Sequence, residues 1–478
     1  MEHDVDVCVI GTGPGGYVAA IRGAQLGLKV AVVEREELGG VCLNRGCIPT
    51  KAMLRSADLL TTFMHSADFG ILAENVRVDY AKVLARKDKV VKQLVGGVAS
   101  LLESNGVQVI RGSGRLVERR KVLITGANEA AISAKNVIIA TGSEPASLPI
   151  KGASGSGVID SDGALELREV PQSMLVIGGG AVGAEWANIF GAFGSQVTLV
   201  EMLPTLLPLE DEDMGRALAR SLSRRGITVH TDAKLEEISD GDDGKKVGTL
   251  TLKDGKQERV AADMVLIGVG RKPNTEGLGL DDVGVKTDRR GFVEIDDHLR
   301  TSVPNVYAIG DVSGKQLLAH LASHQGITAM ETIAGQDKTM DYKAVPSCTF
   351  THPEVATVGL SEREARDKGY DVRVGKFPLA ASGRAMTYGD TDGLVKVVAD
   401  AKYGELLGVH IIGPSASDMI PEAVLGIRLE ATLEDITGTI HAHPTMAESV
   451  MEAASAASGA ALHLPKPRER AAASNVER

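Results

Sequence analysis

The apolar positions near the start of the chain form two short runs, separated by a glycine-rich turn and a helical stretch. Residues 5–10 are mostly apolar, which is typical of a buried strand. Glycines dominate residues 11–16, residues 17–26 have a helical pattern, and residues 29–33 form the second apolar run. The order of strand, turn, helix and strand predicts a βαβ unit.

The turn of this unit has the spacing of a dinucleotide-binding fingerprint. Gly11, Gly13 and Gly16 follow the first strand, and Glu34 stands at the end of the second. Glycines at these positions let the backbone approach a pyrophosphate at the helix N-terminus, and the acid accepts hydrogen bonds from ribose hydroxyls. The motif is strong evidence here because the strand, the helix and the acid accompany it. We interpret Cys8, within the first strand, as a small buried residue.

The same unit occurs again further along the chain. Residues 174–177 and 196–200 predict its strands, residues 178–183 its turn, and Glu201 its acid. The first glycine and the acid are 23 positions apart in both copies (11 to 34 and 178 to 201). Two such units imply two bound dinucleotides. The glycines of the second turn are Gly178, Gly180 and Gly183.

The acidic residue of the second βαβ unit predicts which nicotinamide cofactor this unit binds. Glu201 suits a free 2′-hydroxyl, whereas a 2′-phosphate would call for an arginine nearby. We therefore predict NAD(H) and not NADP(H). Arg216, Arg220 and Arg224 recur every four residues in the next helical stretch. Their usual meaning is a solvated stripe, although they are the best argument for a phosphate site.

The rest of the pattern is that of a multidomain α/β protein. A chain of 478 residues is too long for one core, so two to four domains are expected. Short strands and helices of a different pattern begin at about Val345. Further predicted elements are a mostly helical stretch at 52–104, strands at 107–110, 121–125, 136–140 and 264–269, and a β-rich excursion at 227–262 with an exposed turn at 240–246.

Composition and charge exclude several classes of function. Hydrophobic residues make up 43% and charged residues 24% of the chain, as in ordinary globular proteins. The net charge of −11 argues against a nucleic-acid or anionic-membrane partner. No apolar run approaches a membrane span, and the acidic N-terminus does not resemble a secretory signal. We expect a cytoplasmic protein without a metal site.

Two of the four cysteines lie close together, at Cys42 and Cys47. A disulfide needs Cα atoms within about 7 Å, but five residues of straight helix span about 7.5 Å. A bridge therefore needs an irregular turn, which Gly46 and Pro49 are placed to allow. If a helix starts at Cys47, Lys51 shares its face and favours the thiolate. For an isolated pair, two reduced and buried cysteines would be the better interpretation.

The surrounding segment decides between these interpretations. G-G-V-C-L-N-R-G-C-I-P-T-K, residues 39–51, resembles the redox-active segment of class I flavin-dependent pyridine nucleotide-disulfide oxidoreductases. The resemblance extends to about Leu464. It implies an α/β fold with two Rossmann-like dinucleotide-binding domains, for FAD and NAD, and a C-terminal α+β dimerisation domain. The implied division is an FAD domain at 1–148 and 276–344, an NAD domain at 149–275, a dimerisation domain at 345–464 and a flexible tail at 465–478.

The family also implies which residues lie at the two cofactors. Gly112-Ser113-Gly114 would form a turn beside the flavin nucleotide, Asp311 would hold the ribityl chain, and Glu185 would pair with Lys51 against the flavin. Val41 replaces the usual threonine and could remove one side-chain contact to FAD. The implied cofactor-binding residues are Gly11, Gly13, Gly16, Glu34, Gly40, Val41, Cys42, Lys51, Gly114, Thr141, Gly142, Ser143, Gly178, Gly180, Gly183, Glu185, Glu201, Gly270, Gly310, Asp311, Leu317, Leu318, Ala319 and His320.

The implied catalytic residues are Cys42, Cys47, Lys51, His443 and Glu448. Cys42 would exchange with a substrate dithiol, and Cys47 would contact the flavin. We expect a helix to start at Pro444, with His443 at its entry and Glu448 about one turn in. A histidine oriented by a carboxylate is a general acid–base arrangement. The family brings this histidine from the other subunit of a homodimer.

Among relatives of this fold, the motifs are most similar to members that oxidise protein-bound dihydrolipoyl groups of 2-oxoacid dehydrogenase or glycine-cleavage complexes and reduce NAD⁺. Glutathione-type reductases would want NADP(H), which Glu201 opposes. Mercuric and large thioredoxin reductases carry a further C-terminal thiol or selenol pair, yet no cysteine follows Cys348. Transhydrogenases of this fold lack the cysteine pair. A flavoprotein scaffold without turnover remains the alternative outside the enzymes.

Overall fold

The computed structural model of the chain describes residues 2–126 and 129–465. It divides into two compact units. One comprises the chain up to Leu209 together with Ala219–Tyr342, and the other comprises Glu210–Leu218 together with the chain from Lys343 onward. Apart from Pro465, the predicted flexible tail lies outside the described residues.

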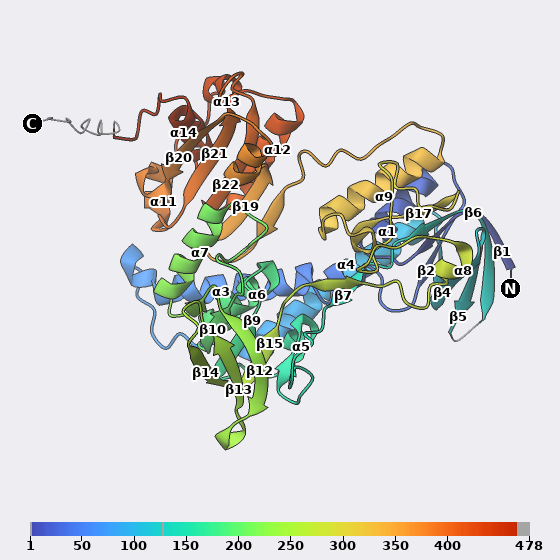
Figure 1. Cartoon of the computed structure of the whole chain (residues 1–478), viewed down its shortest axis with the longest axis horizontal. Coiled ribbons are helices and arrows are strands. Elements are labelled where there is room, and N and C mark those ends of the chain that lie inside the picture. Colours follow the sequence, from blue (N-terminus) through green and yellow to red (C-terminus); the bar gives the residue numbers. More distant parts are fainter. Residues whose placement is uncertain (1, 127–128, 466–478) are drawn as a thin grey trace, which may run out of the picture. The chain divides into compact units, whose positions relative to one another are not determined.

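The first unit is built on a seven-stranded sheet that contains the first predicted βαβ motif (Figure 1). Val7 and Val9 pack into one apolar cluster and Cys8 and Ile10 into another, so that both faces of the sheet are covered. The strand order is β3-β2-β1-β6-β5-β4, with β17 paired in parallel to β6. The strands are β1 (Glu2–Ile10), β2 (Val30–Glu34), β3 (Gln108–Arg111), β4 (Ser113–Glu118), β5 (Lys121–Thr125), β6 (Ala130–Ile139) and β17 (Val306–Ala308).

A second parallel sheet of the same unit contains the second βαβ motif. Its strand order is β11-β10-β9-β15-β8, formed by β8 (Val158–Ile159), β9 (Ser173–Ile177), β10 (Gln196–Val200), β11 (Thr228–His230) and β15 (Met264–Ile267). The predicted β-rich excursion is confirmed as an antiparallel sheet of β12 (Lys234–Asp240), β13 (Lys246–Thr251) and β14 (Gln257–Ala262). Separately, β7 (Ser143–Pro145) pairs with β16 (Arg271–Pro273).

The helices of the first unit follow its turns. α4 has a polar cap, since the Asp79 carboxylate accepts a hydrogen bond from the Lys82 N–H. Within the described residues, no helix is both long enough and apolar enough to cross a membrane. The helices are α1 (Pro14–Gln25), α2 (Gly40–Asn44), α3 (Cys47–Met64), α4 (Tyr80–Ser104), α5 (Ser161–Glu166), α6 (Ala181–Ala192), α8 (Leu280–Val283) and α9 (Ala319–Ile333), with short 3₁₀ turns at Ser66–Phe69, Asp242–Gly244 and Gly310–Ser313.

The mostly helical stretch predicted at 52–104 is confirmed: α3 and α4 cover most of it, and residues 70–79 between them contain no helix. One local prediction needs correction. The turn predicted at Gly112-Ser113-Gly114 is wrong beyond Gly112: Ser113 and Gly114 belong to β4, which pairs with β5. Cross-strand hydrogen bonding overrides the turn preference of the glycines here.

The second unit contains an antiparallel five-stranded sheet of order β18-β19-β22-β21-β20. Helices α12 and α14 pack against it and complete an apolar core. Cys348 is only partly buried. The strands are β18 (Ser347–Thr349), β19 (Glu354–Gly359), β20 (Val372–Pro378), β21 (Leu394–Asp400) and β22 (Leu406–Gly413), and the helices are α10 (Glu362–Asp367), α11 (Gly383–Tyr388), α12 (Ala416–Arg428), α13 (Leu433–Gly438) and α14 (Glu448–Ala457), with a 3₁₀ turn at Leu379–Ala381. Helix α7 (Glu212–Arg224) begins in this unit and ends in the first.

The packing of α14 on β20 depends on Gly375. A Cβ atom there would lie 1.9 Å from the Ala453 oxygen and 2.3 Å from the Ala457 nitrogen. We expect Gly375→Ala to lower the free energy of unfolding by about 2 kcal/mol, because the helix must move away from the strand. Urea unfolding monitored by circular dichroism measures the change. Gly383→Ala is the control, since a Cβ there meets no atom within 4 Å; equal midpoints for the two variants would contradict the expectation.

Candidate active site

The two cysteines of residues 39–51 form a disulfide. Cys42 lies in α2 and Cys47 is the first residue of α3, with Cα atoms 4.7 Å apart. The backbone leaves helical geometry at Gly46, where φ is −131° and ψ is −109°. This break brings the two residues closer than a straight helix would. The predicted irregular turn is confirmed, and both cysteines remain partly exposed.

The disulfide segment packs directly against the first glycine turn. The Gly39 N–H donates to the Thr12 oxygen at 3.0 Å. A Cβ on Gly40 would lie 2.6 Å from the Cα of Gly13. Gly40 also has a φ of 59°, in the left-handed region that favours glycine. Gly39 and Gly40, at the start of α2, therefore place Cys42 next to the start of α1.

Lys51 of α3 and Glu185 of α6 form an ion pair near the disulfide. Because α3 begins at Cys47, Lys51 follows it by about one turn, as predicted. The Lys51 Nζ donates to both carboxylate oxygens of Glu185 in α6, at 2.8 and 2.7 Å. Glu185 is buried, with 5% of its surface exposed. The pairing implied by the family is confirmed, and it places a fixed cation one turn from a sulfur.

The acids of the two βαβ units make the same hydrogen bonds. The Glu34 carboxylate accepts from the Thr12 N–H (2.8 Å) and hydroxyl (2.5 Å) and from the Glu36 N–H (2.8 Å). The Glu201 carboxylate accepts from the Gly179 N–H (2.6 Å) and the Leu203 N–H (2.8 Å). Each acid thus joins the second residue of its glycine turn to the residue two positions after itself. Besides any contact to a ribose, each acid fixes the shape of its turn.

Both turns fit a dinucleotide. Gly13 and Gly180 are the N-cap residues of α1 and α6, with ordinary φ values of −60° and −71°. A Cβ on either residue would meet no atom within 4 Å, so neither the backbone angle nor the packing of the protein requires glycine there. No described side chain caps either helix. Glycines of this kind at uncapped helix starts suit the close approach of a pyrophosphate.

The segments that contain Thr141 and Asn274 lie together. The Thr141 hydroxyl donates to the Asn274 oxygen at 2.7 Å, and the Asn274 side chain donates to the Thr141 oxygen at 3.0 Å. The Ser143 hydroxyl donates to the Asp311 carboxylate at 2.5 Å, and the Arg271 Nε donates to the Ser143 hydroxyl at 2.7 Å. The structure therefore joins Ser143 to Asp311 and, separately, fixes Thr141 against Asn274.

Sequence reasoning missed one residue that orders the 3₁₀ turn at Gly310–Ser313. Gln325 of α9 is 1% exposed and accepts a hydrogen bond from the Gly310 N–H at 2.6 Å. Its amide also donates to the Tyr342 hydroxyl at 3.1 Å. No local pattern in the sequence marks this contact, because the two residues lie 15 positions apart and meet only when α9 packs beside the turn.

The remaining residues implied for the cofactors are placed as follows. Val41 lies in α2 and Gly142 precedes β7, while Gly270 directly precedes β16. Gly114 packs over the first sheet, where an added Cβ would lie 3.2 Å from Ile10 and 3.3 Å from Val33. The segment leading into α9 contains Leu317, Leu318, Ala319 and His320, with Ala319 as the first helical residue.

The histidine–carboxylate pair lies in the second unit. The His443 Nδ1 is 2.8 Å from the Glu448 carboxylate, which also accepts from the Thr445 N–H at 2.7 Å. Burial raises the pKa of Glu448, but these two hydrogen bonds outweigh it and leave the pKa below its usual value. The His443 side chain is 79% exposed, so its other ring nitrogen can reach a reactant.

The predicted start of the C-terminal helix at Pro444 is wrong by about one turn. Helix α14 starts at Glu448, and the His443–Pro444 bond is cis. Glu448 is the first residue of the helix and does not lie one turn inside it. Its carboxylate accepts a hydrogen bond from the Thr445 N–H. The neighbouring His441 is held separately, with its Nε2 2.8 Å from the Glu422 carboxylate.

Two further interpretations of the sequence are confirmed. Arg216, Arg220 and Arg224 are exposed along α7, as a solvated stripe would be. Cys8 is fully buried in β1, and burial raises the pKa of its thiol to about 12. The Cys8 thiol therefore stays protonated and is not a nucleophile.

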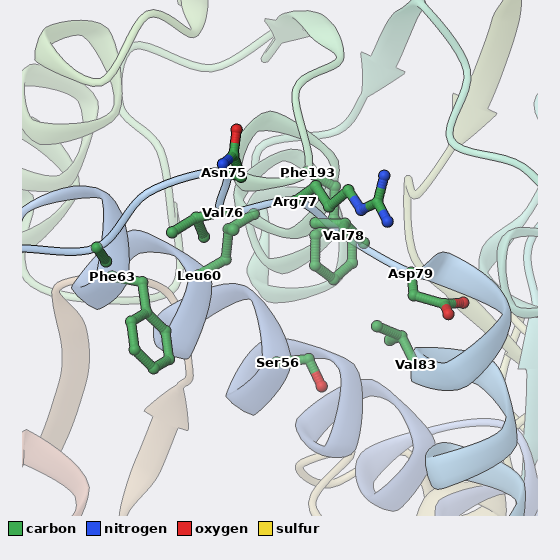
Figure 2. A pocket seen from close by; sticks show the side chains of 11 residues that line it. Ser56, Leu60, Phe63, Asn75, Val76, Arg77, Val78, Asp79, Val83 and Phe193 are labelled. Atoms are coloured by element: carbon green, nitrogen blue, oxygen red, sulfur yellow. The ribbon is translucent and has the colours of Figure 1, made fainter.

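A cavity of about 460 Å³ lies elsewhere in the first unit (Figure 2). Leu60 and Phe63 of α3, Val76 and Val78 of the following loop, and Phe193 line it. None of its lining residues is one of the predicted site residues. We therefore do not place the active site there.

Comparison with known proteins accounts for nearly the whole chain. The family model described as pyridine nucleotide-disulphide oxidoreductase matches residues 5–326, and the model of the dimerisation domain of that family matches residues 345–454. A dihydrolipoyl dehydrogenase of Thermus scotoductus is 48% identical over 461 residues, covering 96% of this chain and 98% of the relative. A dihydrolipoyl dehydrogenase of Geobacillus stearothermophilus is 45% identical over 463 residues, with 96% and 98% covered.

Solved structures show the same architecture. LpdA of Mycobacterium tuberculosis has a TM-score of 0.86 at 28% identity, covering 94% of this chain and 99% of that one. The HOCl-induced flavoprotein disulfide reductase of Escherichia coli, in its Cu(II) complex, has a TM-score of 0.85 at 28% identity, with 95% and 99% covered. Together with the disulfide and the two glycine turns, these matches show that the chain belongs to the pyridine nucleotide-disulphide oxidoreductase family.

Proposed function

We propose that this protein is a dihydrolipoyl dehydrogenase, an enzyme that oxidises the dithiol of a dihydrolipoyl group to its disulfide and reduces NAD⁺. The observation that carries the proposal is the Cys42–Cys47 disulfide at the start of α3, packed against the first glycine turn. The relatives that carry this name match almost the full chain. Glu201 at the second turn favours NAD over NADP.

The cofactors are FAD and NAD. FAD would lie at the first turn (Gly11, Gly13 and Gly16) with Glu34, and NAD would lie at the second turn (Gly178, Gly180 and Gly183) with Glu201. We propose Thr141, Ser143 and Asp311 as further FAD contacts, because Ser143 is bonded to Asp311 and Thr141 is fixed by Asn274 on the neighbouring segment. When bound, FAD supplies two-electron transfer from the reduced cysteine pair to NAD⁺.

The protein's own chemistry is thiol–disulfide exchange. A substrate thiolate attacks the Cys42 sulfur, the Cys42–Cys47 bond breaks, and Cys47 leaves as a thiolate. The second substrate thiolate then attacks the substrate sulfur of the mixed disulfide and releases Cys42. The substrate has become a cyclic disulfide, and its two electrons reside on the cysteine pair. Lys51 lies one turn from Cys47 and stabilises negative charge there.

The protons of the substrate thiols need a base, and we propose His443 of a second subunit. The matched dimerisation domain supports a homodimer. The Glu448 carboxylate orients the imidazole through Nδ1 and stabilises its protonated form. His443 takes a proton from the attacking substrate thiol and holds it until solvent removes it.

The remaining assignments complete the proposal. We propose an FAD domain at 1–148 and 276–344, an NAD domain at 149–275 and a dimerisation domain at 345–464, because the three large sheets fall within these ranges. We propose lipoyl-bearing proteins of 2-oxoacid dehydrogenase or glycine-cleavage complexes as partners. The proposed location is the cytoplasm.

Steady-state turnover tests the assignment. We expect the FAD-loaded enzyme to reduce NAD⁺ with dihydrolipoamide, with NADP⁺ a poor substitute because Glu201 repels a 2′-phosphate. Cys47→Ser should abolish this turnover, since no disulfide remains to accept the electrons. Cys348→Ser, outside the pair, is the control and should keep it. Absence of dihydrolipoamide turnover together with reduction of another disulfide would overturn the substrate assignment.

Glu448→Gln tests the acid–base pair. We expect a loss of kcat/KM for dihydrolipoamide of about 100-fold, because the imidazole loses the carboxylate that stabilises its charge. The pKa of Glu448 is lowered, so in the wild type the carboxylate stays ionised at and above its ordinary titration range. A wild-type rate that falls between pH 8 and pH 6 would therefore report a group other than Glu448.

The matched control is Glu452→Gln, one turn further along α14. Glu452 holds His463 at 2.8 Å, a contact of the same kind. We expect its kcat/KM to stay close to that of the wild type. Equal losses in the two variants would show that Glu448 acts only through the packing of α14.

A further inference from the structure

A row of five polar side chains crosses the sheet of the second unit, one from each strand. Neighbouring members are register partners: Ser347 with Thr357, Thr357 with His410, His410 with Lys396, and Lys396 with Lys376. Residues aligned across a sheet point to the same face. We call Ser347, Thr357, His410, Lys396 and Lys376 the polar row.

The short segment before and into α7 supplies an acid for most of this row. Glu210 accepts from the Ser347 hydroxyl at 2.7 Å and from the Thr357 hydroxyl. Asp211 accepts from the Lys396 ammonium at 2.9 and 3.0 Å. Asp213 lies 2.7 Å from Lys396 and 2.8 Å from Lys376. The row therefore binds this segment by charge and hydrogen bonds.

Lys396 is the centre of this contact. Its side chain is 3% exposed, as is that of Asp211, and Glu362 adds a third carboxylate at 3.0 Å. Burial alone would lower the pKa of Lys396, but the hydrogen bonds with Asp213 and Asp211 outweigh it and raise the pKa. Burial also lowers the pKa of neighbouring His410, which keeps a second charge away from the lysine. A buried cation on a central strand is costly unless it is paired in this way.

The same chain segment supports the second glycine turn. The Leu207 N–H donates to the Gly179 oxygen at 2.9 Å. The Leu206 side chain is fully buried against Gly179, where an added Cβ would lie 2.6 Å from Leu206 Cδ2. Leu207 has a φ of 48°, a strained angle for leucine. A backbone held in such a conformation depends on its surroundings.

The anchor and the turn support are close along the chain. Asp211 follows Leu207 by four residues, which can span at most about 14 Å. Glu201, at the other end of this loop, is fixed by the Gly179 and Leu203 N–H groups. The loop is thus held at the glycine turn on one side and at the polar row on the other.

We propose that Lys396 is a positioning residue for the nicotinamide-cofactor site. By holding Asp211 and Asp213, it keeps Leu206 and Leu207 against Gly179, so that affinity for NAD(H) depends on a lysine of the C-terminal sheet. This inference rests on the proposed assignment of the second turn to NAD. It adds to that assignment a residue that touches neither the cofactor nor the substrate.

Lys396→Met tests the proposal in the FAD-loaded enzyme. Hydrogen exchange of the peptide that covers residues 203–211 is measured without nucleotide, and the Kd of ADP-ribose is measured by calorimetry. We expect exchange at the Leu207 amide to be faster by about tenfold and the Kd to rise by about fivefold or more. Lys402→Met, which removes an exposed lysine after β21, should match the wild type in both measurements.

A second variant covers the case in which Lys396→Met fails to fold. Asp211→Asn combined with Lys396→Met removes both buried charges and avoids an unpaired carboxylate, and it should show the same faster exchange and weaker binding. Unchanged exchange and an unchanged Kd in a folded variant would overturn the proposal and leave the row as support for the sheet alone. Failure of the wild type to bind ADP-ribose would instead overturn the NAD assignment.

Discussion

The close approach of the disulfide segment to the first glycine turn is the constraint on which the site depends. Gly40 can lie against Gly13 only because Gly40 carries no side chain, since a Cβ there would lie 2.6 Å from the Gly13 Cα. Hydrogen bonds extend this contact in both directions: the Thr12 N–H donates to the Glu34 carboxylate, and the Gly39 N–H donates to the Thr12 oxygen. A carboxylate at the end of β2 thereby fixes the turn, and the turn fixes the place where α2 begins. The disulfide follows from these contacts together with the break at Gly46.

The two βαβ units use one pattern of hydrogen bonds and differ in what packs on it. In the first, the residues after the acid lead into the cysteine pair. In the second, they form the loop that carries Leu206 and Leu207 back against Gly179. A duplicated turn can therefore serve two chemical purposes, because the segment after the acid decides what lies beside it. This difference puts the exchangeable sulfurs beside only one of the two turns.

Charge is used in two opposite ways in the second unit. His443 is largely exposed and has one carboxylate partner, which leaves a ring nitrogen open for a reactant. Lys396 is buried among three carboxylates and has no such freedom. The exposed pair suits proton transfer, whereas the buried cluster suits fixed geometry. Burial and the number of partners distinguish the two roles more clearly than residue type does.

The sequence by itself determined the two βαβ units, the cysteine pair and the nature of the β-rich excursion, because spacing and glycine content are local properties of the chain. It also indicated the Lys51–Glu185 pair through resemblance. The tertiary structure decided the rest. Strand pairing turned Ser113 and Gly114 into part of β4, and contacts of Glu448 moved the start of α14. The support that Gln325 gives to Gly310 and the polar row around Lys396 join residues far apart in sequence. No local pattern marks such contacts, because they form only when separate elements pack together.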